Sequence, residues 1–158
     1  MKKNYRPGAL GALIDEYERA AEELAALVEG MSDADFPIVR DRQTTDEHCR
    51  SVQTILSHVV HSGHGYANQI RKALGMVFRE HEFALVSRTD CPGLLRGMMN
   101  YTAETFQNRW HYGDEEITSV RMVAPWGPQY DLEQLLEHAI VHILRHRRQV
   151  ERFLSPSP

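Results

Sequence analysis

The chain has 158 residues, a length that suits one domain with its own apolar core, so we expect residues 1–158 to form a single domain. Its 22 acidic and 18 basic residues give a formal net charge of −4, which offers no positive field for nucleic acid. No segment approaches the roughly 18 uninterrupted apolar residues of a membrane span, and no apolar run follows the basic start. We therefore expect a cytoplasmic protein whose partners include neither nucleic acid nor a membrane.

Two amphipathic helices are predicted in the first half of the chain. Apolar residues recur at spacings of three and four over residues 9–30, where a glycine ends the pattern. Thr44 and Glu47 match a capping box for a second helix, whose apolar pattern continues to about residue 74. Gly63 and Gly65 lie inside this pattern and indicate a bend or the close approach of a partner helix.

The middle of the chain holds one further helix between two long connections. Residues 75–87 are apolar without clean periodicity, which favours an extended connection. Thr89 or Asp90 can cap a third helix that runs to about Trp110. Residues 111–130 combine strand-like apolar positions with a proline-rich segment, so they are predicted to form a long crossover loop.

The final helix is predicted over residues 132–154, because Asp131 and Gln134 form a capping box in front of a strong apolar pattern. The chain then contains four long helices and no run of alternating strands. This pattern predicts an all-α fold, a four-helix bundle with one or two long crossover connections.

Six of the nine histidines fall in two short windows, one in the second helix and one in the last. In the last helix, His142 and His146 interrupt the apolar stripe between Ala139 and Val150, so both point toward the bundle interior. Imidazoles at i and i+4 can share one ion, because their Cβ atoms lie about 5–6 Å apart and zinc–nitrogen bonds are about 2.0–2.1 Å long. Taken alone, this pair fits hydrogen-bonded interior histidines equally well.

The second helix offers a third ligand. His58 follows Ile55 by three residues and lies beside the apolar stripe, where it can face the last helix. We therefore predict that His58, His142 and His146 bind one divalent metal ion. His138 and His142 also have i, i+4 spacing, but His138 flanks the stripe, so we expect it in the pocket wall or as a support for the ligands.

The other aromatic and imidazole side chains stay outside the metal set. His61 is expected to be a solvated or rim residue, and His64 a structural or pocket-lining one. Trp126 and Tyr130 lie just before the last helix and either close one wall of the pocket or, for Trp126, cap the core. The remaining histidines lie near element ends or in loops and are expected at the surface: His48, His81 and His111.

Other metal constellations do not fit the chain. Cys49 and Cys91 form no CxxC pair, so we expect them to be reduced, small apolar side chains without a metal or redox role. A di-iron carboxylate bundle needs inward Glu-x-x-His pairs on two helices, and a zincin needs HExxH. Neither motif occurs in the sequence.

Two stretches, Ser51–Val60 and Leu136–Val150, together with the Pro125–Gly127 loop, resemble the DinB-like, or YfiT-like, four-helix-bundle metalloproteins. The resemblance implies one histidine from the second helix and two from the last around a divalent ion, which are the three histidines already chosen. Zinc or nickel is the favoured metal, with iron or manganese as further candidates. The commoner family ending is His-Arg-Gly-Gln, and this chain departs from it with Arg148 in place of the glycine.

Three neutral nitrogens leave at least one coordination position open, which is typical of catalytic sites. The resemblance also implies a homodimer and relates the chain to transferases that act with thiols such as bacillithiol or mycothiol. We therefore expect a metal-dependent enzyme that activates a low-molecular-weight thiol for transfer to an electrophilic substrate. Two alternatives stay open: a hydrolase that uses metal-bound hydroxide, with Glu137 as a candidate base, and a non-catalytic metal-binding helical module. No catalytic residue is assigned.

Overall fold

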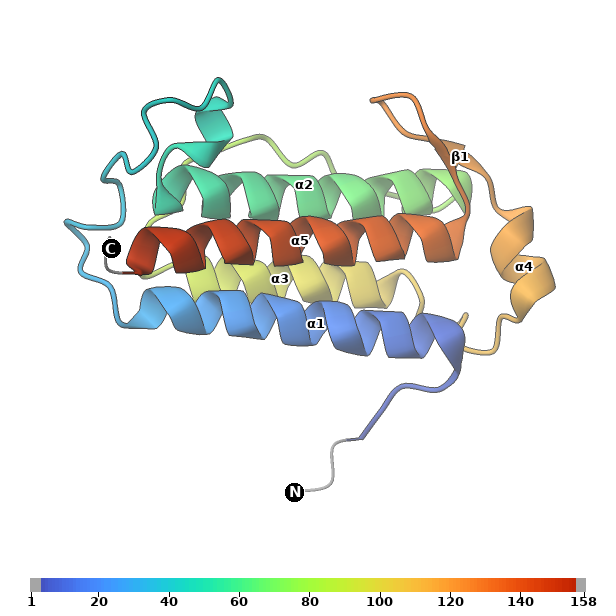
Figure 1. The fold of residues 1–158 in the computed structure, drawn as a ribbon. Helices are drawn as coiled ribbons and strands as arrows, with labels where there is room; N and C mark the ends of the chain where they lie inside the picture. Colours follow the sequence, from blue (N-terminus) through green and yellow to red (C-terminus); the bar gives the residue numbers. More distant parts are fainter. Residues whose placement is uncertain (1–3, 156–158) are drawn as a thin grey trace.

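Four long helices pack side by side in the computed structural model, which describes residues 4–155 (Figure 1). The elements follow in the order α1 (Gly8–Glu29), η1 (Glu47–Cys49), α2 (Val52–Ala73), α3 (Cys91–Glu104), α4 (Asp114–Ser119), β1 (Met122–Val123), β2 (Gln129–Tyr130) and α5 (Leu132–Leu154). The predicted all-α bundle is confirmed. None of the helices in the described part of the chain is long and apolar enough to cross a bilayer.

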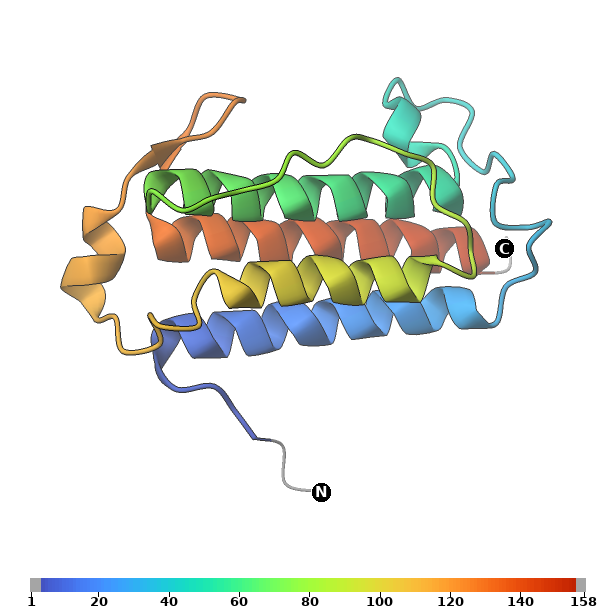
Figure 2. The ribbon, with the colours of Figure 1, turned by 180° about the vertical axis from the view of Figure 1, so that it is seen from behind.

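Each long helix contacts two others, so that the order around the bundle is α1, α5, α2, α3. Helices α2 and α5 run in opposite directions, which places the beginning of α2 beside the end of α5 (Figure 1). Helices α2 and α3 run in the same direction, because the chain returns along the bundle between them (Figure 2). This arrangement brings the two histidine windows of the sequence onto neighbouring helices.

The returning segment, residues 75–87, is extended as predicted. The end of this segment is bound to α2 by a hydrogen bond in which the Val86 N–H donates to Ser57 Oγ at 3.0 Å. The Gln53 amide donates back to the Val86 carbonyl oxygen at 2.9 Å. These two bonds hold the end of the crossover against the first half of α2.

Helix α2 begins later than the sequence predicts. The capping box is formed by Ser51 and Thr54, whose side chains each accept from the other's backbone N–H at 3.1 Å. Thr44 and Glu47 do not cap this helix. Residues 47–49 instead form the short helix η1, capped by Asp46, which accepts from the His48 N–H at 2.9 Å. The predicted start was wrong because two capping-box patterns lie a few residues apart.

Helix α3 also ends earlier than predicted, at Glu104. Beyond it the backbone tightens into successive i→i+3 turns, for example from the Phe106 N–H to the Ala103 carbonyl, and these turns cannot propagate an α-helix. The predicted crossover loop contains α4 and a small hairpin, in which β1 and β2 pair antiparallel. Gly127, at φ +111°, allows the hairpin to turn.

The core lies between the four helices and includes Tyr17 and Phe106, each almost fully buried. At Gly63, α3 packs tightly against α2, because a Cβ at this position would collide with the sulfur of Met98. The predicted close approach is therefore found at Gly63 but not at Gly65, where a Cβ would meet nothing within 4 Å.

Candidate metal centre

Helix α5 carries two of the site residues on its buried side. Its start is fixed by Asp131, whose side chain accepts from the Gln134 N–H at 2.9 Å, so the predicted capping box is confirmed. His146 is 8% exposed, and His142, one turn earlier, is half-buried. Both histidines therefore project from α5 toward α2, as the apolar stripe predicted.

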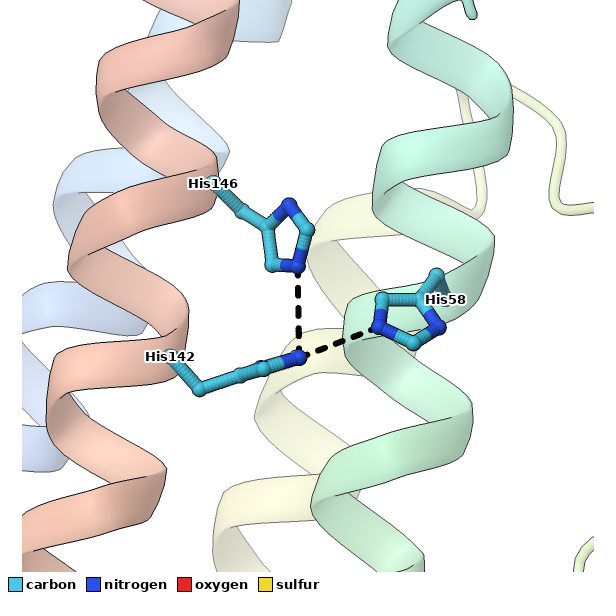
Figure 3. Close-up of side chains that lie close together, drawn as sticks. All are labelled: His58, His142 and His146. Atoms are coloured by element: carbon cyan, nitrogen blue, oxygen red, sulfur yellow. Dashed lines mark hydrogen bonds between the residues drawn. The ribbon is translucent and has the colours of Figure 1, made fainter. Parts of the chain in front are cut away.

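Helix α2 supplies the third histidine from the opposite side. His58 follows the buried Ile55 and precedes the buried Val59, so it stands at the edge of the apolar stripe. Because α2 and α5 are antiparallel, this early position on α2 faces the later half of α5 (Figure 1). Figure 3 shows the His58 ring directed at the rings of His142 and His146.

The three side chains form a tight cluster, called the histidine triad below: His58, His142 and His146. Nε2 of His142 lies 3.0 Å from Nε2 of His58 and 3.2 Å from Nε2 of His146 (Figure 3). The ligand atoms of all three residues lie within 4.8 Å of one another. Two nitrogens on one tetrahedral zinc ion are about 3.3 Å apart, given zinc–nitrogen bonds of about 2.0–2.1 Å. The spacing of the cluster thus fits one shared ion.

Hydrogen bonds do not explain both of the short nitrogen–nitrogen contacts in this cluster. Nδ1 of His146 lies 2.7 Å from Oε1 of Gln149 and donates its proton to it, so Nε2 of His146 presents a lone pair. Nε2 of His142 faces nitrogens on both sides, and a single proton there can be directed at only one of them. At most one of the two contacts is therefore a hydrogen bond, whereas a single cation bound between the rings would account for both short distances.

The triad is electrically neutral at ordinary pH. Burial, with the neighbouring histidines as a smaller cause, lowers the pKa of His58 to about 4 and that of His142 to about 3. Burial also lowers the pKa of His146. Imidazole binds metals in its neutral form, so few protons have to be displaced when an ion enters.

A hollow of about 700 Å³ opens beside the triad. All three histidines line it, and the other lining residues come from η1, the residue before it and the exposed side of α5: Asp46, Cys49, Val141, Leu144, Arg145, Arg148, Gln149 and Arg152. The volume is in the range of small-molecule pockets. The triad therefore has one side open to a ligand.

Two further side chains lie beside the triad, where the sequence did not predict them. His48, expected at the surface, stacks on the ring of His58 with the centroids 4.9 Å apart. Cys49, expected to be a plain apolar residue, is half-buried in the hollow and accepts from Nε2 of Gln149 at 3.5 Å. No spacing pattern predicts these positions. The residues of η1 were expected to continue the second helix, whereas they form a separate short helix that places both side chains beside the triad.

The remaining histidines of α2 form a separate group. His64 stacks on His81 with the centroids 4.1 Å apart, which corrects the surface position expected for His81. His61 is half-buried, which agrees with the rim position among the two expected for it, and its Nδ1 is buried without a hydrogen-bond partner in the described part of the chain. Within residues 4–155, three closely spaced ligand atoms occur at the triad and not in this group.

His138 belongs to an aromatic cluster at the start of α5. Its ring stacks on Trp126 with the centroids 5.2 Å apart, and its Nδ1 lies 3.3 Å from the Tyr130 hydroxyl. Tyr66 connects this cluster to the triad, because its ring contacts both His138 and His142 edge to face. None of the four lines the 700 Å³ hollow, so the pocket wall expected of Trp126 and Tyr130 is not found there. The cluster therefore packs against the ring of His142 through Tyr66.

The comparison with known proteins agrees with the fold. The model of the DinB family matches residues 1–155, nearly the whole chain. No curated protein and no solved structure matches it. Four packed helices, one histidine on α2 and two on α5 are the features for which the sequence resembled this family. The chain belongs to the DinB family.

Proposed function

We propose that the protein is a metal-dependent enzyme that activates a low-molecular-weight thiol for transfer to an electrophilic substrate. One observation carries the proposal: three neutral imidazole nitrogens converge beside a hollow large enough for a small molecule. Three protein ligands leave a coordination position open, as catalytic metal sites do and closed structural sites do not. When bound, a divalent ion would supply the Lewis acidity that lowers the pKa of a thiol or a water molecule beside it.

The side chains around the triad fit this role. Oε1 of Gln149 accepts a hydrogen bond from the Nδ1–H of His146, which keeps the proton on Nδ1 and the lone pair of Nε2 directed at the site. Imidazole nitrogens suit zinc and nickel and also bind iron, so zinc or nickel is the proposed metal, with iron or manganese as further candidates. The hollow holds the reactants and limits their access to the triad to one side.

In the proposed reaction the sulfur of the thiol forms a bond to a carbon atom of the electrophile. The leaving group departs with the electrons of its former bond, and the thiol proton passes to solvent. The chain contributes the site that keeps the sulfur beside the electrophile, and proximity of this kind supplies a large part of many enzymatic rate accelerations.

Hydrolysis is supported less well by the residues of the hollow. Glu137, the base considered from the sequence, is exposed and does not line the hollow. Asp46 is the one carboxylate that does, and it accepts both from the His48 N–H and, at 3.3 Å, from the Cys49 thiol. Within the described residues, no carboxylate of the hollow is therefore left unengaged to take a proton from water.

Multiple-turnover assays of the zinc-loaded and nickel-loaded protein test the proposal. One assay combines 2-mercaptoethanol with 1-chloro-2,4-dinitrobenzene, and the other uses p-nitrophenyl acetate without a thiol. The His142→Ala variant, prepared in the same way, serves as the control that lacks a triad ligand. Turnover that needs both the thiol and an intact triad is expected. Ester hydrolysis without a thiol would favour the hydrolase, and inactivity in both assays would favour a non-catalytic metal-binding module.

A further inference from the structure

The outer edge of α5 carries a row of arginines beside the triad. Arg145, Arg148 and Arg152 follow one another at steps of three and four residues, so they project from the same face of the helix. All three line the hollow that opens beside the triad. His142 and His146 lie in the neighbouring row of the same helix, one step closer to the core. We call these three arginines the arginine wall.

Little of the charge of the arginine wall is neutralised. Within residues 4–155, neither Arg145 nor Arg152 forms an ion pair, and Arg148 approaches Glu151 only at 3.6 Å. Arg147, which points to another side of α5, shows the contrast, because it pairs with Glu23 and also lies 3.2 Å from Glu151. All three side chains are exposed, so their charges face solvent and stay available to a ligand in the hollow, although the chain as a whole has a net charge of −4.

Two alternative roles do not account for the arginine wall. The negative end of the helix dipole acts within the last turn of a helix, whereas Arg145 lies nine residues before the end of α5 at Leu154. Asp46, the carboxylate of the same hollow, already accepts from the His48 N–H and the Cys49 thiol. The helix end therefore accounts for Arg152 alone and Glu151 reaches only Arg148, at 3.6 Å, so neither of them accounts for Arg145.

We infer that the arginine wall binds an acid group, a carboxylate or a phosphate, of the small molecule whose thiol reaches the histidine triad. Guanidinium forks bind both kinds of oxyanion through paired hydrogen bonds. This inference rests on the proposed function and adds the chemical class of the thiol. A neutral or cationic thiol would leave the arginine wall without a partner.

The position of the arginine wall also limits the size of the ligand. Arg145 is the residue next to His146, and Arg152 follows His146 by six residues, which corresponds to about 9 Å along the helix. The acid group should therefore lie within roughly 9 Å of the sulfur, and a separation of only a few bonds is enough to reach Arg145. Small thiol acids and short thiol peptides meet this requirement, and long acyl-chain thiols without an acid group do not.

Calorimetric titration of the zinc-loaded chain compares two small thiols: 2-mercaptosuccinate, which carries two carboxylates, and 2-mercaptoethanol, which carries a neutral hydroxyl group instead. We expect 2-mercaptosuccinate to bind at least about 10-fold more tightly at low ionic strength, since charge-assisted bonds to arginine are the stronger kind. The Arg145→Ala and Arg152→Ala variants should each lose most of this preference. Arg147→Ala, on the same helix but outside the hollow, should keep it. Equal affinities for the two thiols, or a preference that survives in both arginine variants, would overturn the inference.

Two further titrations separate this inference from the proposed function. Succinate and inorganic phosphate, which carry no thiol, are titrated into the metal-free chain and the same variants. Binding of either anion that depends on Arg145 and Arg152 supports the arginine wall even in a chain that takes up no metal, and the tighter of the two identifies the acid group. Absence of any arginine-dependent anion binding overturns the inference, whereas failure to bind metal overturns only the proposed function.

Discussion

Replacement of Gln149 by alanine should weaken metal binding at the histidine triad by about 10–100-fold, the usual cost of removing the group that orients a metal-ligating histidine. The hydrogen bond from Nδ1 of His146 to Oε1 of Gln149 is 2.7 Å long, and it keeps the proton off Nε2. Without an acceptor, the proton can move to Nε2 and the ring can turn away. A 10–100-fold loss corresponds to about 1.4–2.8 kcal/mol, close to the roughly 1.5–3 kcal/mol of a hydrogen bond to a charged partner.

Competition with a chromophoric zinc chelator at pH 7.5 measures this affinity directly. Gln149→Glu should remain within a few-fold of the unmodified protein, because a carboxylate still accepts the Nδ1 proton. Gln107→Ala, at an exposed turn remote from the hollow, is the matched control. The reasoning is refuted if Gln149→Ala binds zinc within twofold of the unmodified chain.

Three further outcomes are expected. Cys49→Ser should keep about one metal ion per chain in elemental analysis, because its sulfur contacts Gln149 and not the triad; loss of the ion would identify a sulfur ligand. Gly63→Ala should lower the free energy of unfolding, measured in urea, by about 1–3 kcal/mol because the new Cβ collides with Met98. Gly65→Ala should not lower it, because a Cβ there meets open space. Equal losses of stability in the two variants would contradict this packing. The metal-free protein should lose stability as the pH falls from 6.5 toward 4, because burial lowers the pKa of His58 to about 4 and that of His142 to about 3. The same histidines in the unfolded chain keep their ordinary pKa and take up protons first, which favours unfolding. A melting temperature that stays constant over this pH range would refute the prediction.

The sequence predicts the last helix well because its signals are local. Asp131 and Gln134 mark its start, and the apolar stripe fixes which face is buried. His142 and His146 lie in that stripe, so their direction follows from spacing alone. The same reasoning places His58 beside the stripe of α2, and the antiparallel packing of two helices then brings the three residues together.

The prediction failed where local signals compete or where the site depends on a loop. The pattern from Thr44 to Glu47 resembles a capping box as closely as the one that Ser51 forms, and only the packed fold selects between them. Because η1 was assigned to the second helix, the positions of His48 and Cys49 could not be foreseen. The hollow, too, depends on the placement of η1 and the residue before it beside α5, which no periodic pattern predicts.

Metal content of matched alanine variants tests the central claim most directly. His138 and His142 have the same spacing as His142 and His146, but His138 is held against Trp126, away from the triad. The unmodified chain, purified without chelators and loaded with zinc, should carry about one ion. His142→Ala and His146→Ala should lose this stoichiometric ion, while His138→Ala should keep it at saturating zinc. Retention of the ion by His146→Ala together with its loss in His138→Ala would place the site one turn earlier on α5 and contradict the account.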